Sequence, residues 1–97
     1  MNVTIQSVKF DAADKLKGFI EQKVNKLDVF FDRIIDAEVI LKLDKSETTE
    51  NKVAEIGLKV PGTELFAKKQ TKTFEEAIDL CCEALRKQLI KKKEKVK

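Results

Sequence analysis

Histidine, tryptophan and tyrosine are absent from this 97-residue sequence, and glycine and proline are scarce. The lack of histidine removes the most common general base and the most common metal ligand of proteins. A Ser-His-Asp triad or a Cys-His pair therefore cannot form within the chain. None of the three glycines is spaced as in a phosphate-binding loop. The sequence thus predicts a protein that is not an enzyme and that holds no cofactor or small-molecule substrate.

The sequence has only two cysteines, Cys81 and Cys82, and they are adjacent. On a helix, neighbouring side chains point about 100° apart, so these two thiols are poorly placed to bridge each other. Two cysteines without histidine make a poor zinc site, and we expect no bound metal. We interpret both as small apolar groups on the inner side of a helix. Without a disulfide framework, a secretory signal or a long apolar run, we expect a cytoplasmic protein with no membrane segment.

What the sequence does contain is charge: 38% of its residues are charged, against about 25% in an average protein. The net charge is only +3, so the distribution of the charges is more informative than their sum. The length fits a single domain, which we assign to residues 1–97, with fraying expected at residues 94–97.

Apolar residues alternate with polar ones at residues 2–9, within 34–45, at 53–60 and at 64–70, which predicts four strands. Helical spacing predicts one helix over residues 12–28, capped by Asp11, and a second from about Thr73 to the C-terminus. Pro61-Gly62 fits the centre of a type II turn, and the polar residues 45–51 predict a loop. The order is therefore β-α-β-β-β-α, an α+β fold in which both helices cover one face of a four-stranded sheet.

The first predicted helix divides its charges between two flanks. Lys15, Lys23 and Lys26 fall within a sector of about 80°, whereas acidic residues such as Glu21 lie roughly opposite. The second helix divides its charges lengthwise: residues 75–83 are acidic and residues 86–97 are strongly basic. The helix dipole favours this order but acts mainly within the terminal turn, whereas the basic block spans about three turns. A phosphate-binding surface accounts better for the excess, and this pattern alone makes Arg86 a candidate contact.

The segments KLKGFIEQKVNKLDVFFDRI, VILKLDK and ELFAKKQTKTFEEAIDLCCEALRKQLIKKKEK closely resemble the ribosome hibernation promoting factor and ribosome-associated inhibitor family. The resemblance covers nearly the whole chain, in the right order and at the right separations. It implies a protein that binds the small ribosomal subunit, and the 70S ribosome, in the channel that holds messenger RNA and tRNA. Occupying the A and P sites there would reversibly inhibit translation in stress or stationary phase.

The resemblance also implies a set of contacts with 16S rRNA phosphates. The expected residues are Lys23, Lys26, Arg33, Lys87, Lys91 and Lys93, with Lys42 as a weaker carry-over. Glu75 stands where members of the family often have tyrosine, so the start of the second helix is left out of the site. The chain resembles the short form of the family, and we expect a monomer in isolation.

Two alternatives remain open from the sequence. The first is a general double-stranded RNA-binding or RNA-chaperone module that uses the same basic helices. The second is a protein-interaction domain whose charged helices are simply solvated. Salt dependence separates the last from the others, because neutralising six to ten phosphates costs roughly 10³–10⁵ in affinity between 50 and 200 mM salt.

Overall fold

The structure, a computed structural model, describes residues 1–44 and 49–95. The elements follow the chain as β1 (Asn2–Ser7), α1 (Asp14–Asn25), a 3₁₀ helix η1 (Lys26–Val29), β2 (Asp36–Leu43), β3 (Lys52–Val60), β4 (Thr63–Thr71) and α2 (Phe74–Lys95). The predicted order of strands and helices is therefore confirmed. Part of the predicted loop, residues 45–48, and the last two residues of the expected frayed end lie outside the described residues; the backbone is helical as far as Lys95.

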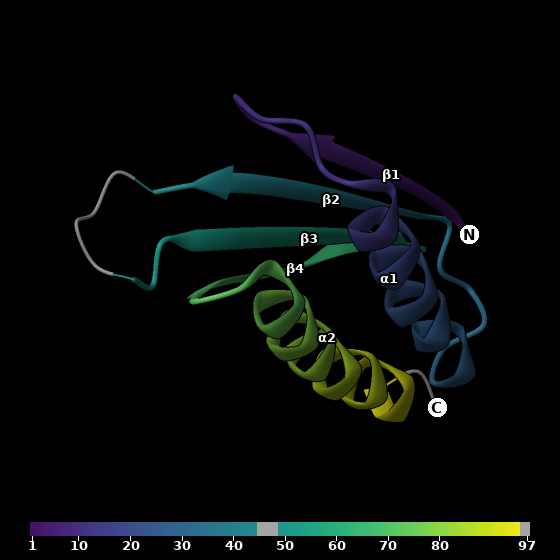
Figure 1. Ribbon diagram of the computed structural model, residues 1–97. Coiled ribbons are helices and arrows are strands. Elements are labelled where there is room, and N and C mark those ends of the chain that lie inside the picture. The colour runs from purple at the N-terminus through teal and green to yellow at the C-terminus, as the bar shows by residue number, and fades with distance from the viewer. Residues whose placement is uncertain (45–48, 96–97) are drawn as a thin grey trace.

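The four strands form one sheet in the order β1-β2-β3-β4, with β2, β3 and β4 as an antiparallel meander. β1 joins the edge of β2 in parallel, and α1 makes the crossover that this pairing requires. Both helices lie on the same face of the sheet (Figure 1). No helix of residues 1–44 and 49–95 lies on the other face, so the sheet has a covered face and an open face.

The core lies between the covered face and the helices because alternate strand residues point there. Leu41 of β2 and Ile56 and Leu58 of β3 are fully buried. Ile20 of α1 and Leu85 of α2 meet them from the helix side with no exposed surface. These buried residues fall at the helical and alternating positions identified in the sequence. The apolar pattern therefore predicted correctly that the helices pack on the sheet.

Local signals decide where the elements begin and end. The hydroxyl of Thr73 accepts a hydrogen bond from the backbone N–H of Glu76 at 3.1 Å and caps α2. Gly62 has a φ of 84°, which the predicted turn after Pro61 requires of its second central residue. The predicted cap at Asp11 is wrong: Ala13 occupies the N-cap of α1, without a side-chain hydrogen bond. The predicted single helix over residues 12–28 also tightens into η1 after Asn25.

Candidate nucleic-acid interface

The last turns of α2 present two exposed lysines on one face. Lys87 and Lys91 are four residues apart, so they lie one above the other along the helix. Leu85 and Leu89, fully buried on the opposite side, hold this face outward. Neither lysine forms an ion pair with the side chains described for residues 1–44 and 49–93. Exposed cations of this kind are available to bind phosphate.

Arg86 and Lys93 are seven residues apart and occupy a second face of α2, which is directed toward η1. The Arg86 guanidinium lies 5.7 Å from the ring centroid of Phe30, just after η1. Arg86 also bonds to the carboxylate of Glu83 one turn earlier. That hydrogen bond lowers the pKa of Glu83 and raises the pKa of Arg86. Arg86 is therefore held in place over an aromatic ring, with part of its charge already compensated.

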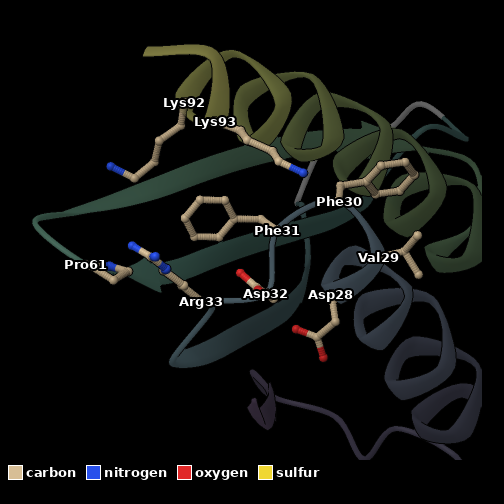
Figure 2. A pocket seen from close by; sticks show the side chains of 9 residues that line it. All are labelled: Asp28, Val29, Phe30, Phe31, Asp32, Arg33, Pro61, Lys92 and Lys93. Carbon is tan, nitrogen blue, oxygen red and sulfur yellow. The ribbon is translucent and has the colours of Figure 1, made fainter. Parts of the chain in front are cut away.

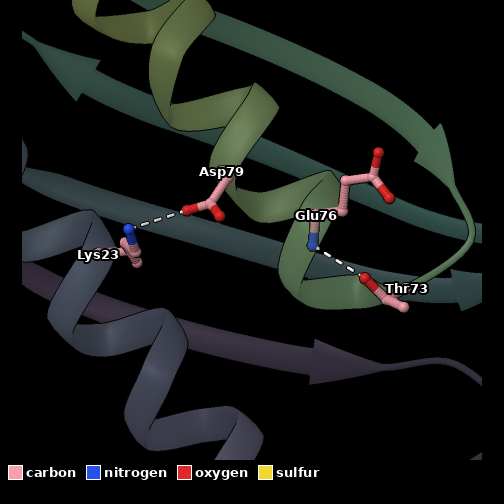
Figure 3. A network of polar contacts seen from close by, with 4 residues as sticks. All are labelled: Lys23, Thr73, Glu76 and Asp79. Carbon is pink, nitrogen blue, oxygen red and sulfur yellow. Dashed lines mark hydrogen bonds and ion pairs between the residues drawn. The ribbon is translucent and has the colours of Figure 1, made fainter.

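Lys23 of α1 forms an ion pair with α2. Its ammonium nitrogen lies 3.0 Å from Oδ1 of Asp79 on α2, as Figure 3 shows. The same nitrogen is 5.6 Å from the ring centroid of Phe19. The Lys23 side chain keeps 36% of its surface exposed, so it can still meet a ligand from outside. Lys26, at the start of η1, is exposed and makes no ion pair within the described residues.

A pocket of about 410 Å³ opens between η1, the segment that follows it and the end of α2 (Figure 2). Arg33, Lys92 and Lys93 supply its cations, and Phe30 and Phe31 supply its aromatic surface. The sequence predicted Arg33 and Lys93 as phosphate contacts, but it did not predict that they line the same pocket. It missed Lys92 altogether, although the consecutive lysines at the end of the helix were a signal for it.

Acidic groups and small apolar surfaces complete the pocket. Asp28 and Val29 line it from η1, Asp32 from the chain between η1 and β2, and Pro61 from the turn between β3 and β4. In Figure 2 the carboxylate of Asp32 points toward Phe31 and Arg33. The pocket therefore offers cations, an aromatic ring and hydrogen-bond acceptors within one opening.

Lys42 lies apart from the other predicted contacts. Its neighbour Leu41 is buried under the helices, so Lys42 points to the open face of the sheet. There it pairs with Glu55 of the adjacent strand, whose side chain is only 14% exposed. The structure thus gathers Lys23, Lys26, Arg33, Arg86, Lys87, Lys91 and Lys93 on the helix side and leaves Lys42 on the other.

The two cysteines offer little reactivity. Cys81 is fully buried, and Cys82 is partly buried beside it. Burial raises the pKa of Cys81 to about 11 and that of Cys82 to about 12. At neutral pH both are therefore thiols, which are poor nucleophiles and poor metal ligands. Among the described residues, no three Cys, Asp or Glu side chains are grouped to hold a metal ion. None of the helices described is both long and apolar enough to cross a membrane.

Comparison with known proteins defines the class of protein to which this fold and surface belong. Residues 3–97 match the family described as Sigma 54 modulation protein / S30EA ribosomal protein, and the chain belongs to that family. A ribosome hibernation promoting factor from Azotobacter vinelandii is 37% identical over 95 residues, which cover 98% of this chain and 85% of the relative. One from Escherichia coli K12 is 34% identical over 97 residues, which cover 100% of this chain and 96% of the relative. The predicted family is confirmed.

Solved structures share the fold. A ribosomal subunit interface protein from Coxiella burnetii has a TM-score of 0.86 at 22% identity, over 97% of this chain and 99% of that one. The N-terminal domain of Thermus thermophilus Protein Y has a TM-score of 0.81 at 24% identity, over 94% and 98%. The predicted arrangement of two helices on a four-stranded sheet is thus confirmed.

Proposed function

We propose that this protein binds the small ribosomal subunit through the cations on its helix side and thereby inhibits translation reversibly. The observation that carries the proposal is that seven predicted phosphate contacts lie on one side of the molecule, around η1 and along α2. The relatives named ribosome hibernation promoting factors supply the biological setting. A ribosomal partner would place the protein in the cytoplasm, and the described residues offer no catalytic constellation.

The mechanism we propose is occlusion. The helix-side cations would bind the phosphates of 16S rRNA along the channel that holds messenger RNA and the tRNA anticodon ends. Phosphate contacts fix the position of a protein on RNA and carry little sequence information, which suits binding at one shaped site on a large RNA. With that channel filled, the A and P sites could not accept tRNA. Release would restore the ribosome, because no covalent step is involved.

Co-sedimentation with purified 30S subunits, 50S subunits and 70S ribosomes at two salt concentrations tests the proposal. We expect association near one to one with 30S and 70S but not with 50S, and weaker association at the higher salt. Excess messenger RNA with tRNA should displace the protein from 30S subunits. If it bound no ribosomal particle at low salt, the proposal would be wrong.

A generic double-stranded RNA serves as the comparison for the alternative function. An RNA-chaperone or duplex-binding module would bind that RNA as tightly as it binds 30S subunits, and messenger RNA with tRNA would not displace it selectively. No feature of the structure favours this alternative over ribosome binding. Two of the seven predicted contacts, Arg33 and Lys93, instead line a pocket, which a uniform duplex would not fill.

A further inference from the structure

The pocket beside η1 has a composition that phosphate binding alone does not explain. A surface that only attracts phosphates needs cations, and Lys87 and Lys91 already provide them on the exposed side of α2. The pocket adds the ring of Phe31 and the carboxylates of Asp28 and Asp32. Carboxylates repel phosphates, so their presence among the cations calls for a ligand that also donates hydrogen bonds.

Phe31 is the aromatic ring that is open to a ligand. Arg86 covers its neighbour Phe30 at 5.7 Å from the ring centroid. Within the described residues, no ring or cation stacks on Phe31 in the same way. Figure 2 shows its ring between the lysines of α2 on one side and Arg33 on the other. An aromatic face between cations is the arrangement on which proteins stack an unpaired nucleobase beside its phosphate.

Asp32, which follows Phe31 in the chain, indicates which edge of a base would be read. The Asp32 carboxylate points toward the space between Phe31 and Arg33. A carboxylate accepts hydrogen bonds, and guanine presents two neighbouring donors, N1–H and the N2 amino group, on its Watson–Crick edge. Cytosine and adenine present one amino donor on that edge beside an acceptor nitrogen. Uracil presents a single imino donor between two carbonyl oxygens, so it fits a carboxylate least well.

The size of the pocket agrees with one nucleotide. Its volume of about 410 Å³ lies toward the lower end of the range of roughly 300–1,000 Å³ for small-molecule sites. Resting on the proposed function, we propose that the pocket receives one unpaired nucleotide of the ribosomal RNA, with guanine preferred. Its base stacks on Phe31, its phosphate lies against Arg33 and Lys93, and Asp32 accepts from the base edge. The phosphate contacts outside the pocket then set the affinity, and the pocket sets the register.

The first test uses the free protein, so that it does not depend on ribosome binding. The ¹⁵N-labelled chain is titrated with guanosine 5′-monophosphate, uridine 5′-monophosphate and ribose 5-phosphate while its amide signals are followed. Guanosine monophosphate should shift the amides of residues 28–33 and 92–93 and bind several-fold more tightly than the other two probes. Gly57 and Phe66, on the open face, should not move. Equal shifts with ribose 5-phosphate would show a purely electrostatic surface and overturn the proposal.

The second test measures affinity for 30S subunits across a range of salt concentrations. Phe31→Leu keeps an apolar side chain but removes the stacking face, and should weaken binding about 5- to 150-fold. Because no charge is removed, the salt dependence should keep its slope. Phe66→Leu is the matched control, since Phe66 is 55% exposed on the open face, and it should bind as the wild type does. Thermal unfolding verifies that both variants fold.

The outcomes separate this proposal from the broader one. If Phe31→Leu binds 30S subunits as tightly as the wild type, the nucleotide pocket is wrong while ribosome binding stands. If the wild type binds no 30S subunits but guanosine monophosphate still fills the pocket, ribosome binding is wrong while the nucleotide site stands.

Discussion

The two sides of this sheet carry cations in different ways. On the helix side, Lys26, Lys87 and Lys91 are exposed and form no ion pair with the side chains described for residues 1–44 and 49–93. On the open face, Lys42 pairs with Glu55, while Lys59 stands opposite Asp36 and Glu64 on its two neighbouring strands. The comparison shows that the number of lysines does not define a phosphate-binding surface. We expect the side of the sheet on which the cations lie, and how far their charge is compensated within the protein, to decide which of them bind phosphate.

Reversing charge on each side gives the largest contrast. Lys87→Glu with Lys91→Glu should weaken binding to 30S subunits by at least about 100-fold, because two phosphate contacts become repulsive. Lys59→Glu with Lys68→Glu makes the same change in net charge on the open face and should cost less than about 3-fold, if only helix-side cations meet the RNA. Equilibrium co-sedimentation measures both, and circular dichroism confirms folding. Equal losses for the two pairs would mean that net charge alone governs binding.

Truncating one apolar side chain on each face of the sheet should cause different losses of stability. Leu85→Ala removes a fully buried side chain between α2 and the sheet and should lower the free energy of unfolding by about 2–5 kcal/mol. Val53 is 4% exposed on the open face, which no described helix covers. Val53→Ala should lower the free energy of unfolding less than Leu85→Ala, because a smaller side chain is lost and fewer groups pack around it. Urea unfolding provides the values. A larger loss for Val53→Ala would contradict the placement of the main core between the helices and the covered face.

Alkaline pH should remove the stability that the two thiols of α2 contribute. The pKa values of Cys81 and Cys82 are raised to about 11 and about 12 from an ordinary value of 9.0. The unfolded chain therefore releases these protons first, so their contribution to stability is intact below pH 9 and is lost as pH rises toward 11–12. Unfolding free energies of the wild type and of Cys81→Ala with Cys82→Ala should differ by a constant below pH 9 and converge above it. A difference that stays constant up to pH 11 would contradict the raised pKa values.

Releasing a paired cation on the helix side should strengthen ribosome binding slightly. Asp79→Asn frees Lys23 and removes a negative charge, so the affinity for 30S subunits should rise about 2- to 3-fold. Stability should change by less than about 1 kcal/mol because the pair is largely exposed. Glu76→Gln removes the same charge from an exposed position one turn earlier and should have a smaller effect. If the two variants behave alike, the Lys23–Asp79 pair does not limit binding.

The smallest effect is expected at Gly57 in the middle of the open face. A Cβ atom added there would have no neighbour within 4 Å, and glycine weakens the interior of a strand. Gly57→Thr should therefore raise the free energy of unfolding by about 0.5–1 kcal/mol and leave 30S affinity unchanged. Reduced affinity in this variant would show that the open face also meets the ribosome.

Much of the fold could be predicted because each element repeats its own period. Alternation at Ala37, Val39 and Leu41 identified a strand, and the spacing of Leu85 and Leu89 identified the inner side of α2. The change to a 3₁₀ helix at Lys26 and the cap at Ala13 were not predictable, since Asp11 is the more usual capping residue type. At these two helix ends, the packing of the chain against the core decides the conformation, and the residue type does not predict it.

The cations themselves could be found from sequence, but their partners could not. Lys23 and Asp79, or Arg33 and Lys93, come together only through the packing of α1, η1 and α2. The alternation of Leu41 and Lys42 did carry a usable signal, because it places Lys42 on the face away from the helices. The pocket had no such signal, as its lining comes from three separate segments of the chain.

Tethered hydroxyl-radical probing tests most directly whether the helix side meets the ribosomal RNA. An iron chelate would be attached to Val29→Cys, at the 80% exposed last residue of η1, or to Phe66→Cys on the open face. Cys81 is buried, Cys82 is partly buried and both have raised pKa values, so the introduced cysteine should react selectively. We predict strong cleavage of 16S rRNA near the messenger RNA and tRNA channel from residue 29 and little from residue 66. Stronger cleavage from residue 66 would contradict the account.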